Sequence, residues 1–214
     1  MRFWRIAIAL AACFGVGLQF FLMVSGRPPA EAASKIVEFF SYFTIVSNIL
    51  ASVALTAPLV APASRLGAWA EQAGPRAAVA TYLTITALVY HAILASQWRP
   101  EGLHLLADTL LHTATPIAFL VDLAVRGGAG EARWIAALKA LVLPAAYGAW
   151  TLVHGALSGF YPYPFMNVTK RGYPAVVLTM LEMTVAFAVV SLAFVALSRV
   201  RSRVASPRTQ PISA

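Results

Sequence analysis

The chain has few charged residues and almost no cysteine. Charged side chains make up 11% of its 214 residues, against 60% hydrophobic residues. Soluble domains carry roughly 25% charged residues, so this composition excludes a soluble globular domain. The single cysteine, Cys13, excludes both a disulfide framework and a cysteine-based metal site. The sequence therefore predicts a polytopic membrane protein.

The charge that is present is mostly basic, with a formal net charge of +8. The arginines and lysines lie in short connections and near the C-terminus rather than along one continuous helix face. Membrane proteins concentrate Arg and Lys in their cytoplasmic loops, so topology accounts for the basic excess. We expect the membrane as a partner and no nucleic acid.

Apolar runs of membrane-spanning length divide the chain. A span needs ~20 mainly apolar residues. The first run lacks a small-x-small cleavage pattern, which favours a span over a cleaved signal peptide. No internal repeat is visible, so the sequence predicts an all-α membrane protein, a single six-transmembrane-helix bundle over residues 1–198. The predicted spans are Trp4–Val24, Ile36–Val60, Ala77–Ser96, Leu105–Val125, Trp134–Gly159 and Ala175–Leu197.

Basic residues are unequal on the two sides of this predicted bundle. By the positive-inside rule the richer side, which carries both termini, faces the cytoplasm. Residues 199–214 are basic and contain Pro and Ser, which predicts a disordered cytoplasmic tail held near anionic lipid. The Ala- and Arg-rich composition favours a bacterial inner membrane. The side with the termini has Arg2, Arg5, Arg65, Arg76, Arg126, Arg133, Arg199, Arg201, Arg203 and Arg208, and the other has Arg27, Lys35, Arg99, Lys170 and Arg171.

The fourth predicted span carries ionisable residues in its first half. Each such residue costs at least about 2.5–3.5 kcal/mol in hydrocarbon, so it usually faces a bundle interior or a cavity. Asp108 and His112 are four residues apart, which places them on one helical face within hydrogen-bonding reach. A carboxylate beside an imidazole fixes its tautomer and raises its basicity, as a general base requires. A polar clamp between helices is the alternative interpretation.

Other predicted spans bring polar groups to the same outer layer. At 1.5 Å per residue, Thr44 lies roughly 12 Å deep, and His112 and Glu182 lie roughly 10 Å deep. Asn48 follows Thr44 by one turn on the same face. His91 and His154 lie near the outer ends of their spans, and for these two and Glu182 a packing role is an equal alternative.

A hydroxyl, an imidazole and a carboxylate shielded from bulk water suit acyl transfer. The imidazole of His112 would take the Thr44 proton as the hydroxyl attacks an ester carbonyl. Asn48 would donate a hydrogen bond to the developing oxyanion, with Asp108 and His154 in supporting roles. Such a hydrolase needs no metal or cofactor. The aromatic, Pro-rich loop 161–174 is predicted to cap the outer mouth of the bundle.

Three segments resemble one known family. FFSYFTIVSNIL (39–50), LLHTATPIAF (110–119) and VHGALSGFYPYPF (153–165) together resemble the androgen-induced and androgen-dependent family of intramembrane threonine hydrolases. The resemblance implies that Thr44 is the nucleophile and His112 the essential histidine, and that His154 and the Tyr163-Pro164-Phe165 triplet belong to a shared segment. It also implies a lipid substrate that enters from the bilayer, since known members of the family cleave fatty acid esters of hydroxy fatty acids. The chain has Thr109 where mammalian members carry a second histidine.

Two other classes of function remain open on the residues alone. His91, His112 and His154 on three helices at similar depth are compatible with haem ligation, or with a divalent metal held together with Glu182 or Asp108. Asp108, His112 and Glu182 would also suit a proton relay in a small proton-coupled transporter. Against a transporter, the sequence shows no repeat and no pair of Gly- or Pro-broken helices.

Overall fold

The protein is a bundle of helices, described here by a computed structural model over residues 2–205. Six helical segments are long and apolar enough to cross a membrane, which confirms the predicted all-α, multi-pass architecture. Within the described range there are no strands, only an isolated bridge between Gln72 and Ala129. The spans are formed by α1 (Arg2–Val24), α3 (Phe43–Val60), α5 (Ala73–Val89) with η1 (Tyr90–Leu94), α6 (Gly102–Thr109) with η2 (Leu110–Ala114) and α7 (Thr115–Arg126), α8 (Ile135–Lys139) with α9 (Val142–Ser158), and α11 (Tyr173–Ala205).

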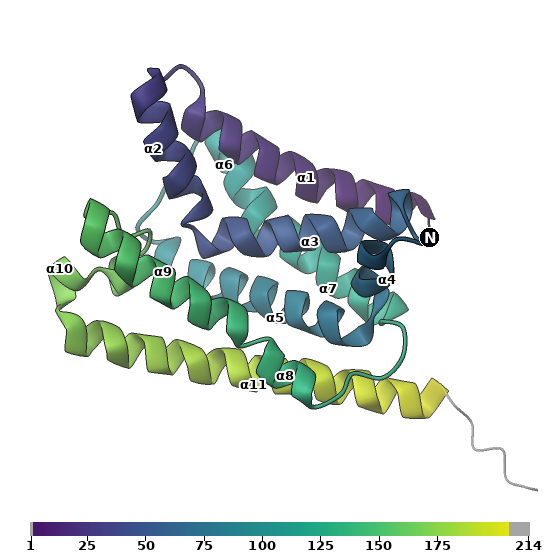
Figure 1. Cartoon of the computed structure of the whole chain (residues 1–214). Helices are drawn as coiled ribbons and strands as arrows, with labels where there is room; N and C mark the ends of the chain where they lie inside the picture. The colour runs from purple at the N-terminus through teal and green to yellow at the C-terminus, as the bar shows by residue number, and fades with distance from the viewer. Residues whose placement is uncertain (1, 206–214) are drawn as a thin grey trace, which may run out of the picture.

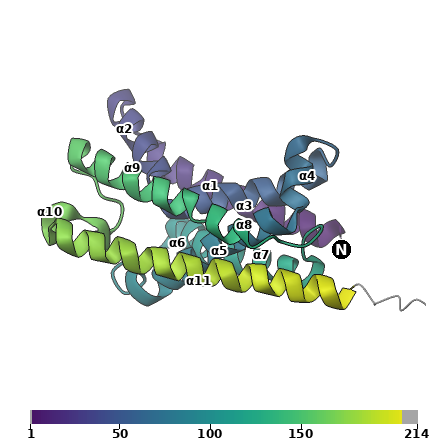
Figure 2. The same ribbon diagram turned by 60° about the horizontal axis from the view of Figure 1, so that its bottom comes forward.

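Helices α3 and α5 lie in the middle of the bundle, and the other spans surround them (Figure 1). The N-terminal end of α1 and the C-terminal end of α11 lie at the same end, as an even number of spans requires (Figures 1 and 2). The short helix α4 (Arg65–Glu71) lies at this end too, and we call it the terminal end. At the opposite end lie α2 (Pro29–Phe40), η3 (Pro164–Met166) and α10 (Val168–Arg171), and we call it the mouth end.

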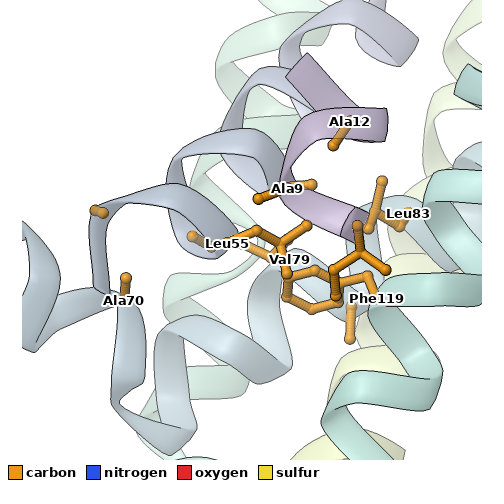
Figure 3. Packing of buried hydrophobic residues seen from close by; sticks show 12 residues of the cluster. Ala9, Ala12, Leu55, Ala70, Val79, Leu83 and Phe119 are labelled. Atoms are coloured by element: carbon orange, nitrogen blue, oxygen red, sulfur yellow. The ribbon is translucent and has the colours of Figure 1, made fainter. Parts of the chain in front are cut away.

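Small residues allow the central helices to approach one another closely. In the largest apolar cluster, Ala9 and Ala12 of α1 pack beside Leu55 of α3 (Figure 3). Leu83 of α5 and Phe119 of α7 complete it, and both are fully buried. Since lipid removes most of the hydrophobic drive for helices to associate, close packing of this kind holds a membrane bundle together.

The second predicted span, Ile36–Val60, is not one helix, and the prediction is wrong on this point. Helix α2 ends at Phe40, and α3 begins at Phe43 after a turn in which Tyr42 is extended. The Ser41 hydroxyl donates to the Val37 carbonyl, and the Trp150 indole donates to Ser41 Oγ at 3.0 Å. The break therefore depends on contacts with α9, and it puts Thr44 in the first turn of α3.

Two spans widen into π-helical turns at the same level. One is η1, whose last hydrogen bond joins Ala95 N–H to Tyr90 O, and the other is η2, where Thr115 N–H bonds to Leu110 O. In the second case Pro116 follows directly and has no N–H to offer the His112 carbonyl, so a regular α-helical bond is missing there. Widened turns of this kind occur often at functional sites.

A buried ion cluster ties α5 to α7 at the terminal end. Arg76 and Asp122 are both fully buried, and Arg76 Nη2 lies 2.6 Å from Asp122 Oδ2. Arg126 Nε reaches Asp122 Oδ1 at 2.9 Å, and Glu71 links Arg126 to Arg5. The sequence prediction placed Arg76 in a loop, but α5 begins at Ala73 and draws it inside.

The predicted disordered tail begins too early. Helix α11 continues to Ala205, and residues 206–214 lie outside the described range. Arg199 pairs with Glu131 at 2.7 Å, and Arg201 donates to the carbonyls of Leu123, Ala124 and Val125 at the end of α7. The Leu123 carbonyl also accepts the Gly127 N–H, and cationic side chains at a helix end satisfy carbonyls that have no partner within the helix. These contacts hold the helix past Ser198.

Candidate active site

A hydroxyl, an imidazole and a carboxylate lie in a row in the mouth half of the bundle. Thr44 Oγ1 in the first turn of α3 is 3.3 Å from His112 Nε2 on η2. On the other side of the imidazole, His112 Nδ1 is 3.1 Å from Asp108 Oδ1 and 3.1 Å from the Asp108 carbonyl. With Nδ1 donating to these oxygens, Nε2 is free to accept the Thr44 proton. The structure thus brings together three residues that the sequence analysis singled out.

The hydroxyl of Tyr163 completes this row from the loop that precedes η3. It lies 3.1 Å from Thr44 Oγ1 and accepts the Thr44 backbone N–H at 3.2 Å. That N–H belongs to the first turn of α3 and has no acceptor within the helix. The Tyr163 ring stacks on Phe165 and meets Tyr42 edge-on, which fixes its position. Burial raises the pKa of Tyr163 above its usual value, so its hydroxyl stays a hydrogen-bond donor.

Tyr90 holds the His112–Asp108 pair from the other widened turn. Its ring stacks on the His112 imidazole with centroids 3.9 Å apart and planes 14° apart. Its hydroxyl donates a short hydrogen bond to Asp108 Oδ2. Both carboxylate oxygens of Asp108 therefore have a partner within the site, and the imidazole is held by its face and by its edge.

Asn48 does not take the position expected of an oxyanion donor. It is fully buried, and its amide Nδ2 donates to the Thr44 carbonyl at 2.8 Å and to the Leu111 carbonyl at 3.1 Å. Both amide protons are thus committed to backbone oxygens of α3 and η2. Asn48 joins the two helices that carry Thr44 and His112, and it has no proton left for a substrate.

The remaining candidates lie apart from this row. His91 is exposed, and its Nε2 lies 3.1 Å from Thr113 Oγ1 on the outside of the bundle. His154 stacks on Trp150 with ring centroids 5.3 Å apart. Glu182 is exposed on α11. None of the three donates to or accepts from Thr44, His112 or Asp108, so a supporting role for them stays a prediction.

The three histidines consequently do not converge. Among residues 2–205 no group of three His, Cys, Asp or Glu side chains lies close enough to hold a metal ion. The arrangement expected for a haem or metal site would require His91, His112 and His154 to face one space, and they face three. The proton relay expected for a transporter would need Glu182 beside Asp108 and His112, whereas it points outward.

Two cavities meet at Thr44. The wider one, about 600 Å³, opens at the mouth end and is lined by His112, Asp108 and Tyr90 together with charged residues of its rim. The narrower one, about 100 Å³, lies between α5, α9 and α11 and is mostly apolar, with no charged residue in its lining. Thr44 and Tyr163 line both. The row of polar groups therefore has access both to the outside and to an apolar compartment.

Comparisons with protein-family models, with curated proteins and with solved structures give no match. The chemistry of the site therefore has to follow from its geometry. Sequence reasoning did not assign roles to Tyr90 and Tyr163, because tyrosine near the end of a span is common as an interface anchor. The one available signal was the position of Tyr163 in the segment that resembles the hydrolase family.

Proposed function

We propose that the protein is an intramembrane ester hydrolase with Thr44 as nucleophile and His112 as general base. The observation that carries the proposal is the 3.3 Å approach of Thr44 Oγ1 to His112 Nε2, with Asp108 on the opposite ring nitrogen. Nucleophile, base and orienting carboxylate in this order form the constellation by which hydrolases activate a hydroxyl, whatever their fold. The same Thr and His are implied by the family resemblance, which supports a fatty-acyl ester as the substrate.

The first half of the reaction transfers the acyl group to Thr44. The Thr44 O–H bond breaks, its proton moves to His112 Nε2, and Oγ1 forms a bond to the ester carbonyl carbon. The carbonyl electron pair moves to the oxygen, where the neutral Tyr163 hydroxyl is available as a donor. The intermediate collapses, the bond to the alcohol oxygen breaks, and His112 returns the proton to that oxygen.

The second half releases the acid. A water molecule from the wide cavity gives a proton to His112 Nε2 while its oxygen attacks the acyl-Thr44 carbonyl. The bond to Thr44 Oγ1 then breaks, and the proton returns to that oxygen. Asp108 keeps the imidazole in one tautomer and stabilises it while it is charged. Tyr90 holds both partners by stacking and hydrogen bonding.

A fluorophosphonate probe tests this proposal, because it reacts with activated hydroxyls. In purified wild-type protein we expect labelling of Thr44, located by mass spectrometry, and hydrolysis of a fatty acid ester. The substitutions Thr44→Ala and His112→Ala should each abolish both. Thr56→Ala is the matched control, since Thr56 lies three turns further along α3 and its hydroxyl bonds to Cys13 Sγ. A folded Thr44→Ala protein with full activity would falsify the proposal.

The orientation in the membrane is part of the same proposal. With the terminal end in the cytoplasm, the mouth end and its wide cavity face the outer side of a bacterial inner membrane. Arg126 of α7 and Arg199 and Arg201 of α11 then lie at the anionic cytoplasmic surface. A reporter that works only in the cytoplasm should be active when it is fused to the C-terminus, and one that works only in the periplasm should be inactive. Activity of a periplasmic reporter would reverse the orientation.

A further inference from the structure

Thr44 and Tyr163 form a wall between two compartments that differ in charge, since charged side chains line only one of them. On the mouth side the cavity rim carries Arg27, Lys35 and Glu38. On the other side the lining has no charged residue and is mostly apolar, with Ile85, Met183 and Phe187 among its side chains. A reacting ester has its carbonyl carbon at Thr44 Oγ1, so its two halves must extend in different directions from this wall.

The apolar cavity has an edge on the lipid-facing surface. Ala145 on α9 and Thr184 on α11 both line it, and both are exposed on the outside of the bundle. Met180 and Met183 also line this cavity and are half-buried. Methionine side chains are flexible and adapt to irregular apolar shapes. The gap between α9 and α11 thus joins the hydrocarbon of the bilayer to Thr44 without passing a charged residue.

We infer that this cavity is an acyl-chain site that takes the carbons next to the ester carbonyl, and that the chain leaves it between α9 and α11 into the bilayer. The inference rests on the proposed function and names the substrate class of that site. The substrate is an ester or thioester of an unbranched apolar acid. Its alcohol or thiol part lies in the wide cavity, whose lining includes charged residues, and leaves through the mouth end.

Size and polarity both favour this direction. A cavity of about 100 Å³ is smaller than the 150 Å³ that accommodates benzene, so it takes only the first few methylene groups of a chain. Moving an acyl chain into the wide cavity instead would bury apolar carbon against Lys35, Glu38 and His104. The polar leaving group finds water there, and the same water is needed to release the acid.

A chain-length series tests the site with two neighbouring alanines. Ala145 lines the cavity, whereas Ala146 is equally exposed but does not line it. In the wild type, kcat/KM for acyl esters should rise about fourfold for each methylene group that the cavity takes up and then level off. Ala145→Trp should remove most of this rise, so the ratio of kcat/KM for octanoyl to that for acetyl esters should fall toward one. Ala146→Trp should behave like the wild type. An unchanged chain-length profile in folded Ala145→Trp overturns the inference.

Photo-crosslinking gives a readout that does not require turnover. A long-chain ester with a diazirine on the third acyl carbon, bound to the Thr44→Ala protein, should label Gly148, Met180 or Met183. Labelling of Trp98 or His104, which line only the wide cavity, would overturn the inference.

The hydrolase proposal and the acyl-chain site can fail independently of each other. If the wild-type protein does not hydrolyse esters but the probe labels Met180 and Met183, the hydrolase proposal fails and the acyl-chain site stands. If the protein is active but the probe labels the wide cavity, the acyl-chain site fails and the hydrolase proposal stands.

Discussion

Tyr163 lies 119 residues from Thr44 in the sequence, yet its hydroxyl contacts both the backbone N–H and the side-chain oxygen of Thr44. The oxygen of the phenol accepts the Thr44 N–H, which has no acceptor within the helix, and lies 3.1 Å from Thr44 Oγ1. One hydroxyl thus caps a backbone N–H at the N-terminus of α3 and contacts the side chain of the proposed nucleophile. The same contact leaves the phenol next to the position of a substrate oxyanion.

Replacing Tyr163 by phenylalanine should slow the reaction more than it weakens substrate binding. The ring and its stacking on Phe165 remain, but the oxyanion loses its donor, so kcat should fall about 10²–10³-fold with little change in KM. Steady-state kinetics on a soluble ester measure both constants. Tyr82→Phe is the control, because the Tyr82 hydroxyl donates to the Ala140 carbonyl away from Thr44. It should lower the unfolding free energy by about 1–3 kcal/mol and leave kcat unchanged. A Tyr163→Phe protein with wild-type kcat would exclude the oxyanion role.

Asp108→Asn should impair the base while the imidazole stays in place. The carboxylate oxygen 3.1 Å from His112 Nδ1 becomes an amide that orients the ring less well and no longer stabilises its charged form. We expect kcat to fall about 10²-fold or more. Tyr90→Phe keeps the stacked ring and removes only the hydrogen bond to Asp108 Oδ2, so its effect should be smaller. Equal rates for Asp108→Asn and the wild type would show that Asp108 only clamps the helices.

Breaking the buried ion pair should destabilise the bundle. Arg76→Met leaves Asp122 buried beside a single arginine, and removing one partner of such a pair costs about 3–5 kcal/mol. The double variant Arg76→Met/Asp122→Leu removes both charges and should recover most of this loss. Arg5→Gln affects a partly exposed pair and should cost about 0–1 kcal/mol. Unfolding in mixed detergent micelles measures all three variants. A double variant as unstable as Arg76→Met would contradict the pairing.

Alkaline pH should destabilise the fold through two phenols at the mouth end. Burial, with smaller effects from Tyr163 and Glu38, raises the pKa of Tyr42 to about 12, and burial raises the pKa of Tyr163 above 10.0 as well. The folded state favours the neutral phenols, so this stability is fully present below pH 10.0 and is lost as the pH rises above it. Thermal unfolding as a function of pH measures the loss. It should be smaller in a Tyr42→Phe/Tyr163→Phe double variant, and an equal loss in both proteins would assign it to other groups.

The sequence predicted which polar residues lie in the outer half of the bundle better than it predicted which of them contact one another. Asp108 and His112 meet because four residues bring two side chains to one helical face, which spacing alone determines. Thr44 meets His112 across two helices, and two indications predicted that pair: their similar depth in the membrane and the resemblance to the hydrolase family. Asn48 shares a helical face with Thr44, as predicted, but spacing says nothing about its hydrogen bonds, which go to backbone carbonyls.

Glu182, His91 and His154 show the limit of arguments from depth. Each lies in the expected half of its span, yet depth along a helix does not specify the direction in which a side chain points. In a span that is apolar on every side, no polar face reports which side meets the bundle. Rotation about the helix axis is therefore set by packing against neighbours.

By itself the sequence determined that the chain crosses a membrane six times, because lipid offers no partner for backbone N–H and C=O groups and each apolar run of sufficient length must form a helix. The tertiary structure alone decided where the second run breaks. The segment around Ser41 and Tyr42 has neither Pro nor Gly, and its turn depends on Trp150 and Tyr163 from distant parts of the chain. Because of that break, the Thr44 N–H has no acceptor within α3 and bonds to Tyr163, and the Thr44 hydroxyl lies beside His112. Only the tertiary structure decides these contacts, because residues so far apart in the sequence meet only when the whole bundle has packed.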